Sequence, residues 1–230
     1  MANQEAIWEY FQNEGIDSFA GSEARLAYLA ALIPSPGKVL NIGVGMGIFE
    51  ARATARGLTV FSLDPSARSI ERLQKLYDLG DRARVGYSQQ IPFPERHFDA
   101  VVLSEVLEHL SDDVSDATLR EVARVLQPEG QFIGTVPARE NLADETVVCP
   151  SCSHRFHRWG HAQSFDPARL QALLESKFSD VRIWERPFVT FSTLNWKGKI
   201  QGVTRVLLNF CGFHGKHENI VFVARRPKTQ

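Results

Sequence analysis

Apolar residues along the chain follow two spacings in turn, and this pattern predicts strands interleaved with helices. Short, nearly continuous apolar runs are typical of strands buried on both faces, whereas apolar residues three or four positions apart are typical of helices packed on one side. The predicted strands cover residues 39–42, 59–63, 83–87, 98–103, 131–136, 181–187 and 219–224. The predicted helices between them cover residues 48–56, 67–77, 116–126 and 167–176. The alternation indicates an α/β fold with a doubly wound, mainly parallel sheet.

Three glycines follow the first predicted strand at every second position: Gly43, Gly45 and Gly47. Glycine lets the backbone turn tightly and approach a ligand closely, so such a turn is typical of a nucleotide-binding site. The dinucleotide pattern G-x-G-x-x-G does not fit, because its third glycine would fall on Ile48 or on Glu50. The turn therefore predicts a different nucleotide ligand.

Together with Asn41, this turn resembles the first motif of the class I S-adenosylmethionine (SAM) dependent methyltransferases, in which an acidic residue precedes G-x-G-x-G. Asn41 stands at the acidic position, where its amide oxygen still offers a hydrogen-bond acceptor. The resemblance implies SAM as the cofactor, with contacts from Asn41 and the three glycines. It also implies a Rossmann-like methyltransferase fold of seven strands, the seventh inserted antiparallel. A strand-to-helix turn without a ligand is the alternative for the glycines alone.

Further candidate cofactor contacts lie at the ends of the second and third predicted strands. Asp64 ends the second strand, where an acidic side chain can accept both ribose hydroxyls of a nucleoside. Its alternative role is to cap the following helix. The stretch 86–93 resembles the segment that contacts adenine in the same family, with Tyr87 at the family's usual Asp. Ser88 and Gln89 are therefore the candidate adenine contacts.

The fourth predicted strand ends in Ser-Glu-Val-Leu-Glu-His-Leu, residues 104–110, which resembles a signature of the small-molecule members of the family. The resemblance implies that Ser104 and Glu105 face the methionine part of SAM. His109 is a candidate general base, because an imidazole near neutrality can take a proton from an attacking hydroxyl or amine. The alternative is that His109 only packs and fixes the loop.

A cluster of cysteines and histidines follows the fifth predicted strand. Cys149 and Cys152 form a Cys-x2-Cys turn, and His157 and His161 complete four ligands with spacing that resembles a zinc knuckle. Four protein ligands leave no open coordination position, so we predict a structural zinc ion in a loop that otherwise lacks regular structure. The alternative is a pair of metal-free thiols, inert or redox-active.

The predicted organisation has four parts and one insertion. They are an N-terminal helical cap (1–36), a SAM-binding core (37–137), a zinc-binding loop (138–163) and the C-terminal half of the sheet (164–230), which carries a helical insertion at 188–218. The apolar spacing in the insertion favours a packed cap over a membrane anchor. A membrane anchor would imply a lipid-linked or quinone-like acceptor. We expect the cap and the insertion to cover the acceptor pocket, and Cys211 to be buried.

Composition narrows the function classes. The chain has 230 residues, of which 43% are hydrophobic and 23% charged, and its net charge of −1 does not favour nucleic acid as a partner. Its first residues lack the basic start and apolar core of a signal peptide, so a cytoplasmic location is expected. We predict a methyltransferase that moves a methyl group from SAM to an oxygen or nitrogen of a small molecule by in-line displacement. The alternatives are an RNA methyltransferase that uses the knuckle, and a non-catalytic SAM- or zinc-binding module.

Overall fold

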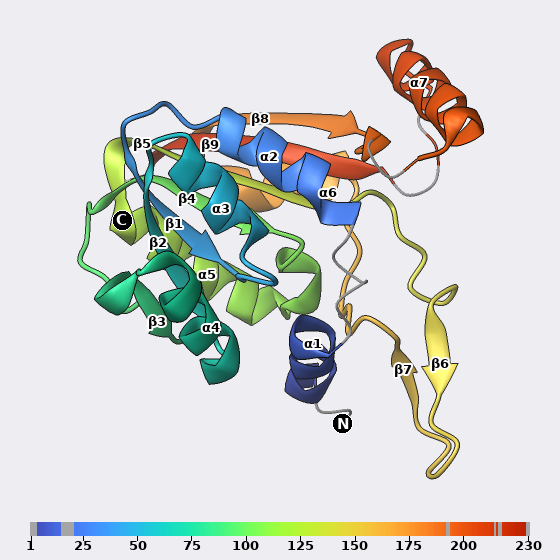
Figure 1. Ribbon diagram of the computed structural model, residues 1–230, viewed down its shortest axis with the longest axis horizontal. Helices are drawn as coiled ribbons and strands as arrows, with labels where there is room; N and C mark the ends of the chain where they lie inside the picture. The colour runs from blue at the N-terminus through green and yellow to red at the C-terminus, as the bar shows by residue number, and fades with distance from the viewer. Residues whose placement is uncertain (1–3, 15–20, 192–193, 214, 216–217, 229–230) are drawn as a thin grey trace.

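A seven-stranded sheet forms the centre of the molecule in the computed structural model, which describes residues 4–14, 21–191, 194–213, 215 and 218–228 (Figure 1). Its strands are β1 (Lys38–Ile42), β2 (Thr59–Asp64), β3 (Ala83–Val85), β4 (Phe98–Ser104), β5 (Leu126–Pro137), β8 (Phe178–Arg186) and β9 (Asn219–Pro227). All seven predicted strands are present, and they differ from the prediction mainly at their ends.

The strand order is β3-β2-β1-β4-β5-β9-β8. The five strands from β3 to β5 are parallel, and β9 lies antiparallel between β5 and β8. The predicted fold class is confirmed, including the antiparallel insertion of the last strand. Parallel strands place their carboxyl ends at one edge of the sheet, which is where such sheets bind ligands.

Helices cover both faces of the sheet (Figure 1). The helices of the described chain are α1 (Gln4–Asn13), α2 (Glu23–Ala31), α3 (Ile48–Ala55), α4 (Ala67–Tyr77), α5 (Asp112–Val125), α6 (Pro167–Glu175) and α7 (Trp196–Phe210), with 3-10 turns η2 (Gly80–Arg82) and η3 (Leu107–His109). Three of these helices have a side-chain oxygen as N-cap: Ser66 accepts the Ser69 N–H at α4, Asp166 the Arg169 N–H at α6, and Asn195 the Gly198 N–H at α7. Such caps satisfy N–H groups that have no partner within the helix.

The core has two layers because successive strand residues point to opposite faces of the sheet. In β4, Ala100 and Val102 pack with α2 and α3, whereas Val101 and Leu103 pack with α5 and α6. All four residues are fully buried. The continuous apolar run of β4 thus reflects a strand that is covered on both sides.

The structure corrects the prediction in two segments. The segment after β5, predicted to lack regular structure, contains a hairpin of β6 (Thr146–Val148) and β7 (Arg155–His157) that extends from the body (Figure 1). Cys211, expected to be buried, is exposed just after α7. In the part of the chain that is described, no helix has the length and apolar character needed to cross a membrane.

Candidate functional site

A cavity of about 1060 Å³ opens at the carboxyl ends of β1, β2 and β4. One end of it is formed by the turns after these strands, and the other by α1, the end of η3 and the segment that follows β7. Eight of the nine predicted cofactor contacts line it: Asn41, Gly43, Gly45, Asp64, Ser88, Gln89, Ser104 and Glu105. Gly47 does not belong to the described lining.

The glycine turn has the backbone geometry that glycine favours. Gly43, Gly45 and Gly47 have φ values of 83°, 48° and 80°. A Cβ on Gly43 would lie 2.7 Å from Cγ2 of Val106, and one on Gly47 would lie 2.5 Å from Cδ2 of Leu73. The turn therefore needs glycine at 43 for the approach of the β4 loop, and at 47 for packing against α4. The need at 47 explains why Gly47 is absent from the cavity wall.

A buried carboxylate that was not predicted from the sequence, Glu50 in α3, lies behind the glycine turn. Glu50 Oε1 accepts hydrogen bonds from Asn41 Nδ2 and from Ser62 Oγ, both at 2.8 Å. Burial raises the pKa of Glu50 above its usual value. The amide of Asn41 is thereby held in one orientation at the cavity wall. An acidic residue in the otherwise apolar first turn of a buried helix was the available signal.

Asp64 is fixed by backbone donors at the end of β2. Its Oδ2 accepts the Val44 N–H and its Oδ1 the Ser66 N–H, both at 2.9 Å, and burial raises its pKa. Gln12 Nε2 from α1 donates to Oδ2 at 3.4 Å. The N-cap of α4 is Ser66, so Asp64 does not take the capping role that was its alternative. Its carboxylate instead accepts a backbone N–H from the glycine turn, at Val44, and lies in the wall of the cavity.

The hydroxyl groups predicted to contact the cofactor have protein partners. Ser88 Oγ lies 2.7 Å from Thr118 Oγ1, and Ser104 Oγ lies 2.8 Å from Thr135 Oγ1. The Ser104 hydroxyl also accepts a hydrogen bond of 3.1 Å from Arg25 Nε. These contacts hold the turns after β3 and β4 in place.

Glu105 lies between two parts of the chain that are distant in sequence. It has a φ of 57°, its Oε1 accepts from Asn219 Nδ2 at 3.0 Å, and its Oε2 lies 3.8 Å from NH1 of Arg25. Both partners also line the cavity. The side chain of Glu105 thus connects the turn after β4 to the start of β9 in the wall of the cavity.

His109 does not have the surroundings of a proton acceptor. Two groups lie 3.2 Å from its Nδ1, the indole N–H of Trp8 and the carbonyl oxygen of Gly160, so this nitrogen is engaged whichever tautomer is present. Burial and the neighbouring His161 lower the pKa of His109 to about 3. The ring therefore stays neutral near pH 7 and binds protons weakly. These contacts favour the packing role that was its alternative.

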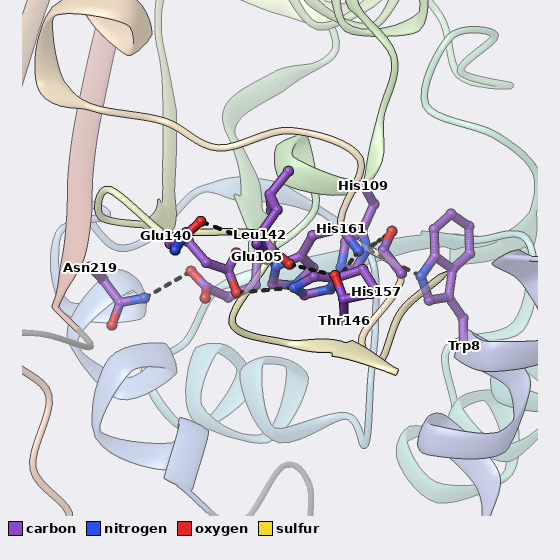
Figure 2. Close-up of polar contacts among 12 residues, drawn as sticks. Trp8, Glu105, His109, Glu140, Leu142, Thr146, His157, His161 and Asn219 are labelled. Carbon is purple, nitrogen blue, oxygen red and sulfur yellow. Dashed lines mark hydrogen bonds and ion pairs between the residues drawn. The ribbon is translucent and has the colours of Figure 1, made fainter. Parts of the chain in front are cut away.

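A second imidazole has the arrangement that His109 lacks (Figure 2). His161 Nδ1 lies 2.5 Å from Glu140 Oε2, and both residues line the cavity. Burial acts to raise the pKa of Glu140, but the hydrogen bond from His161 and the nearby imidazoles bring it below its usual value. In the tautomer that carries its proton on Nδ1, His161 donates this hydrogen bond to the carboxylate and has its lone pair on Nε2.

The four predicted metal ligands fall into two separate pairs. Strand pairing sets Thr146 opposite His157 and Val148 opposite Arg155, so Cys149 and Cys152 lie at the turn of the hairpin and His157 at its other end. Among the described residues, the groups with ligand atoms within 4.8 Å of one another are Glu140–His157–His161 and Glu108–His109–His161, and neither contains a cysteine. The arrangement does not bring the thiols to the histidines.

His157 and His161 lie beside Glu140 and are the second candidate position for a metal ion. His157 Nδ1 accepts the backbone N–H of His161 at 3.2 Å, and burial lowers the pKa of His157. Its single proton therefore sits on Nε2, the atom that faces Glu140 Oε1 at 3.5 Å. A metal-binding imidazole needs a free lone pair on the facing nitrogen. In this tautomer His157 Nε2 does not offer that lone pair, although the three side chains lie close enough together to hold an ion.

The known proteins that this chain resembles are methyltransferases. A family model described as a methyltransferase domain matches residues 14–177. An uncharacterized methyltransferase of Geobacillus thermodenitrificans is 28% identical over 153 residues, which are 65% of this chain and 69% of that protein. A ubiquinone biosynthesis O-methyltransferase of Xanthomonas campestris is 32% identical over 119 residues, but the match covers only 49% of this chain and 48% of that enzyme.

A solved structure shares the fold over nearly the whole chain. It is the Burkholderia thailandensis 1,6-didemethyltoxoflavin-N1-methyltransferase, with bound 1,6-didemethyltoxoflavin and S-adenosylhomocysteine. The TM-score is 0.67 at 18% sequence identity, and the match covers 98% of this chain and 87% of that one. At this identity the likeness concerns the fold.

Proposed function

The chain belongs to the methyltransferase-domain family, and from this premise we propose that it transfers a methyl group from SAM to an oxygen or nitrogen of a small molecule. The observation that carries the proposal is the single cavity with two unlike ends. One end presents the glycine turn and Asp64, and the other presents the Glu140–His161 pair. A donor and an acceptor can therefore meet between them.

The donor end suits SAM by its chemistry. Gly43 and Gly45 keep the backbone free of side chains where the cofactor would lie, and Asp64 offers carboxylate oxygens for ribose hydroxyls. Asn41, Ser104 and Glu105 would surround the methionine part, and Ser88 and Gln89 the adenine. When bound, the cofactor would supply a methyl group on a positively charged sulfur; the acceptor's lone pair would form the new bond to carbon, and the carbon–sulfur bonding pair would stay on the departing sulfur. The residues of this end bind and orient.

At the acceptor end we assign the base to His161, replacing the predicted His109. A proton lost by the attacking hydroxyl or amine would pass to Nε2 of His161, while Glu140 stabilises the resulting imidazolium through Nδ1. His109 would position the site through its contact with Trp8. Methyl transfer itself needs mainly alignment and exclusion of water, which the aromatic side chains of Trp8, Phe11 and Trp159 would provide.

A small-molecule acceptor is supported by the names of two similar proteins, a ubiquinone biosynthesis O-methyltransferase and a 1,6-didemethyltoxoflavin-N1-methyltransferase. The predicted RNA alternative rested on a four-ligand knuckle, and the cysteines and histidines of that knuckle lie apart. The predicted non-catalytic alternative gives no reason for a carboxylate–imidazole pair in the cavity wall. Neither alternative therefore replaces a small molecule as the proposed acceptor.

The first test is titration of the protein with S-adenosylhomocysteine by calorimetry. Gly45→Arg should abolish binding, because the new side chain would enter the cavity. Gly80→Arg is the matched control, since Gly80 has a similar φ of 50° but open space around it. Absence of binding to the unaltered chain, or equal binding by both variants, would overturn the cofactor assignment.

The second test concerns the acceptor. Labelled SAM is incubated with fractions of a cell extract, with and without nuclease treatment, and the transferred label is followed. Label in a low-molecular-weight fraction that resists nuclease supports the proposal. Label that disappears with nuclease would instead establish RNA as the acceptor.

A further inference from the structure

Helix α7 presents its apolar side to solvent. Residues at the helical spacing i, i+4, i+7, i+11 and i+14 form one stripe, which we call the α7 stripe: Trp196, Ile200, Val203, Leu207 and Phe210. Their exposed fractions are 68%, 59%, 49%, 59% and 90%. The sequence predicted that an apolar helix face in this insertion would pack as a cap, and the structure turns it outward.

The opposite side of α7 holds the helix to the body. Gly202 is buried, and a Cβ there would lie 2.8 Å from Cγ1 of Val189 and 3.1 Å from Cε1 of Phe191. At the second-last residue of the helix, Asn209 Nδ2 donates to Glu218 Oε2 at 3.1 Å. A helix that packs through glycine and asparagine leaves its large apolar residues free for another surface. Figure 1 shows α7 standing at the margin of the fold.

The charged residues that α7 itself carries have one sign. Residues 187–217 contain no Asp or Glu, and α7 carries Lys197, Lys199 and Arg205. The Lys197 ammonium lies 5.6 Å from the ring centre of Trp196, so a cation accompanies the aromatic end of the stripe. An apolar face with a Trp and flanking cations is the composition of helices that lie in the interface of anionic membranes.

We propose that α7 docks this protein on the surface of a bilayer that contains anionic lipid, with the α7 stripe in the headgroup region and the lysines against the phosphates. A second copy fits less well, because pairing two such faces would bring cations together without acidic partners. The helix would lie parallel to the membrane, since its glycine side stays packed on the body. Its polar flanks would remain in the headgroup layer.

This docking surface is distinct from the proposed catalytic cavity. Among the residues described, none between 188 and 213 lines the cavity, which α7 approaches only through Glu218 and Asn219 in the following segment. The expectation that the insertion covers the acceptor pocket is therefore wrong for these residues. Loss of membrane binding and loss of cofactor binding can consequently be separated by substitutions.

The test is flotation of the full chain with vesicles of phosphatidylcholine and phosphatidylglycerol, compared with vesicles of phosphatidylcholine only. We expect binding to the anionic vesicles that weakens with added salt. Ile200→Ser combined with Leu207→Ser should lower the partition coefficient at least about tenfold, because two large apolar side chains no longer enter the interface. Leu76→Ser is the matched control, since Leu76 is 61% exposed on α4.

Affinity for S-adenosylhomocysteine is measured on the same variants and should not change. Failure of the unaltered chain to float with anionic vesicles would overturn the proposal, as would equal flotation of the double variant. Sedimentation of the chain as a dimer that the double variant dissociates would assign the α7 stripe to self-association instead. Lysine reversal, Lys197→Glu with Lys199→Glu, should abolish the preference for anionic vesicles.

Discussion

The two ends of the cavity differ in how the chain builds them. The donor end comes from consecutive strand turns, and the shortest hydrogen bonds of Asn41 and Asp64 join residues at most twenty positions apart. Longer-range contacts reach this end at its rim, where Arg25 meets Ser104 and Asn219 meets Glu105. The acceptor end depends on tertiary contacts: Trp8 meets His109 across 101 positions, and Glu140 meets His161 on the two sides of the β6–β7 hairpin (Figure 2). A local site can be recognised from a motif, whereas an assembled one depends on the fold that gathers it.

The largest expected effect lies at the acceptor end. His161→Gln should lower kcat by about 10²–10⁴-fold, since it removes a positioned proton acceptor. Glu140→Gln should lower it less, because the imidazole remains. Turnover is measured by label transfer to the active fraction. His154→Gln is the control, being an exposed histidine at the turn of the hairpin that precedes His161.

The comparison would break if His109→Gln abolished turnover while His161→Gln preserved it. In that case the prediction from the sequence that His109 is the base would be confirmed despite the lowered pKa of His109. Equal losses in both variants, with S-adenosylhomocysteine affinity unchanged, would mean that the two rings act together, with His109 positioning His161 across their 4.7 Å ring separation.

Substitutions at the donor end should change the free energy of unfolding as well as cofactor affinity. Glu50→Leu removes the acceptor shared by Asn41 and Ser62, and each buried donor left without a partner costs about 1–3 kcal/mol. Glu50→Gln should cost much less, since its amide oxygen can accept the same two bonds. Thermal unfolding measures both, with Glu71→Ala, exposed on α4, as the control.

The same pair of variants carries a pH dependence. Burial raises the folded-state pKa of Glu50 above its unfolded value, so the folded chain holds this proton more tightly than the unfolded chain. Stability from that proton is present at low pH and is lost as the pH rises through the folded pKa. Glu50→Gln lacks this loss, so its stability relative to the unaltered chain should rise with pH over that window. A flat difference would contradict the raised pKa.

A smaller effect is expected at Asp64. Asp64→Ala should weaken S-adenosylhomocysteine about tenfold, the order of one good charged hydrogen-bond pair, because the ribose acceptor is lost while the glycine turn remains. Calorimetry measures it, with Asp81→Ala as the exposed control. An unchanged affinity would limit Asp64 to holding the Val44 and Ser66 amides.

The sequence predicted the donor end and missed most of the acceptor end for physical reasons. Glycine spacing reports local backbone geometry, so Gly43 and Gly45 could be placed without the fold. Helical spacing shows which residues of α7 share a face, but the glycine at 202 decided which face packs. The start of α5 at Asp112, rather than at Asp116, lies in a polar first turn that carries no apolar signal. Glu140 had no motif around it and gained a role only through the hairpin.

The smallest expected effect concerns the hairpin turn. Cys149→Ser with Cys152→Ser should change kcat less than about twofold, within the range of surface substitutions, because strand pairing holds these thiols at the opposite end of the hairpin from His157. Zinc content, measured on both proteins purified without chelator, tests the predicted four-ligand site at the same time. A large fall in turnover together with loss of one zinc per chain would show that the hairpin folds its cysteines onto His157 and His161. His161 would then be a metal ligand, and the base would have to be sought elsewhere in the cavity wall.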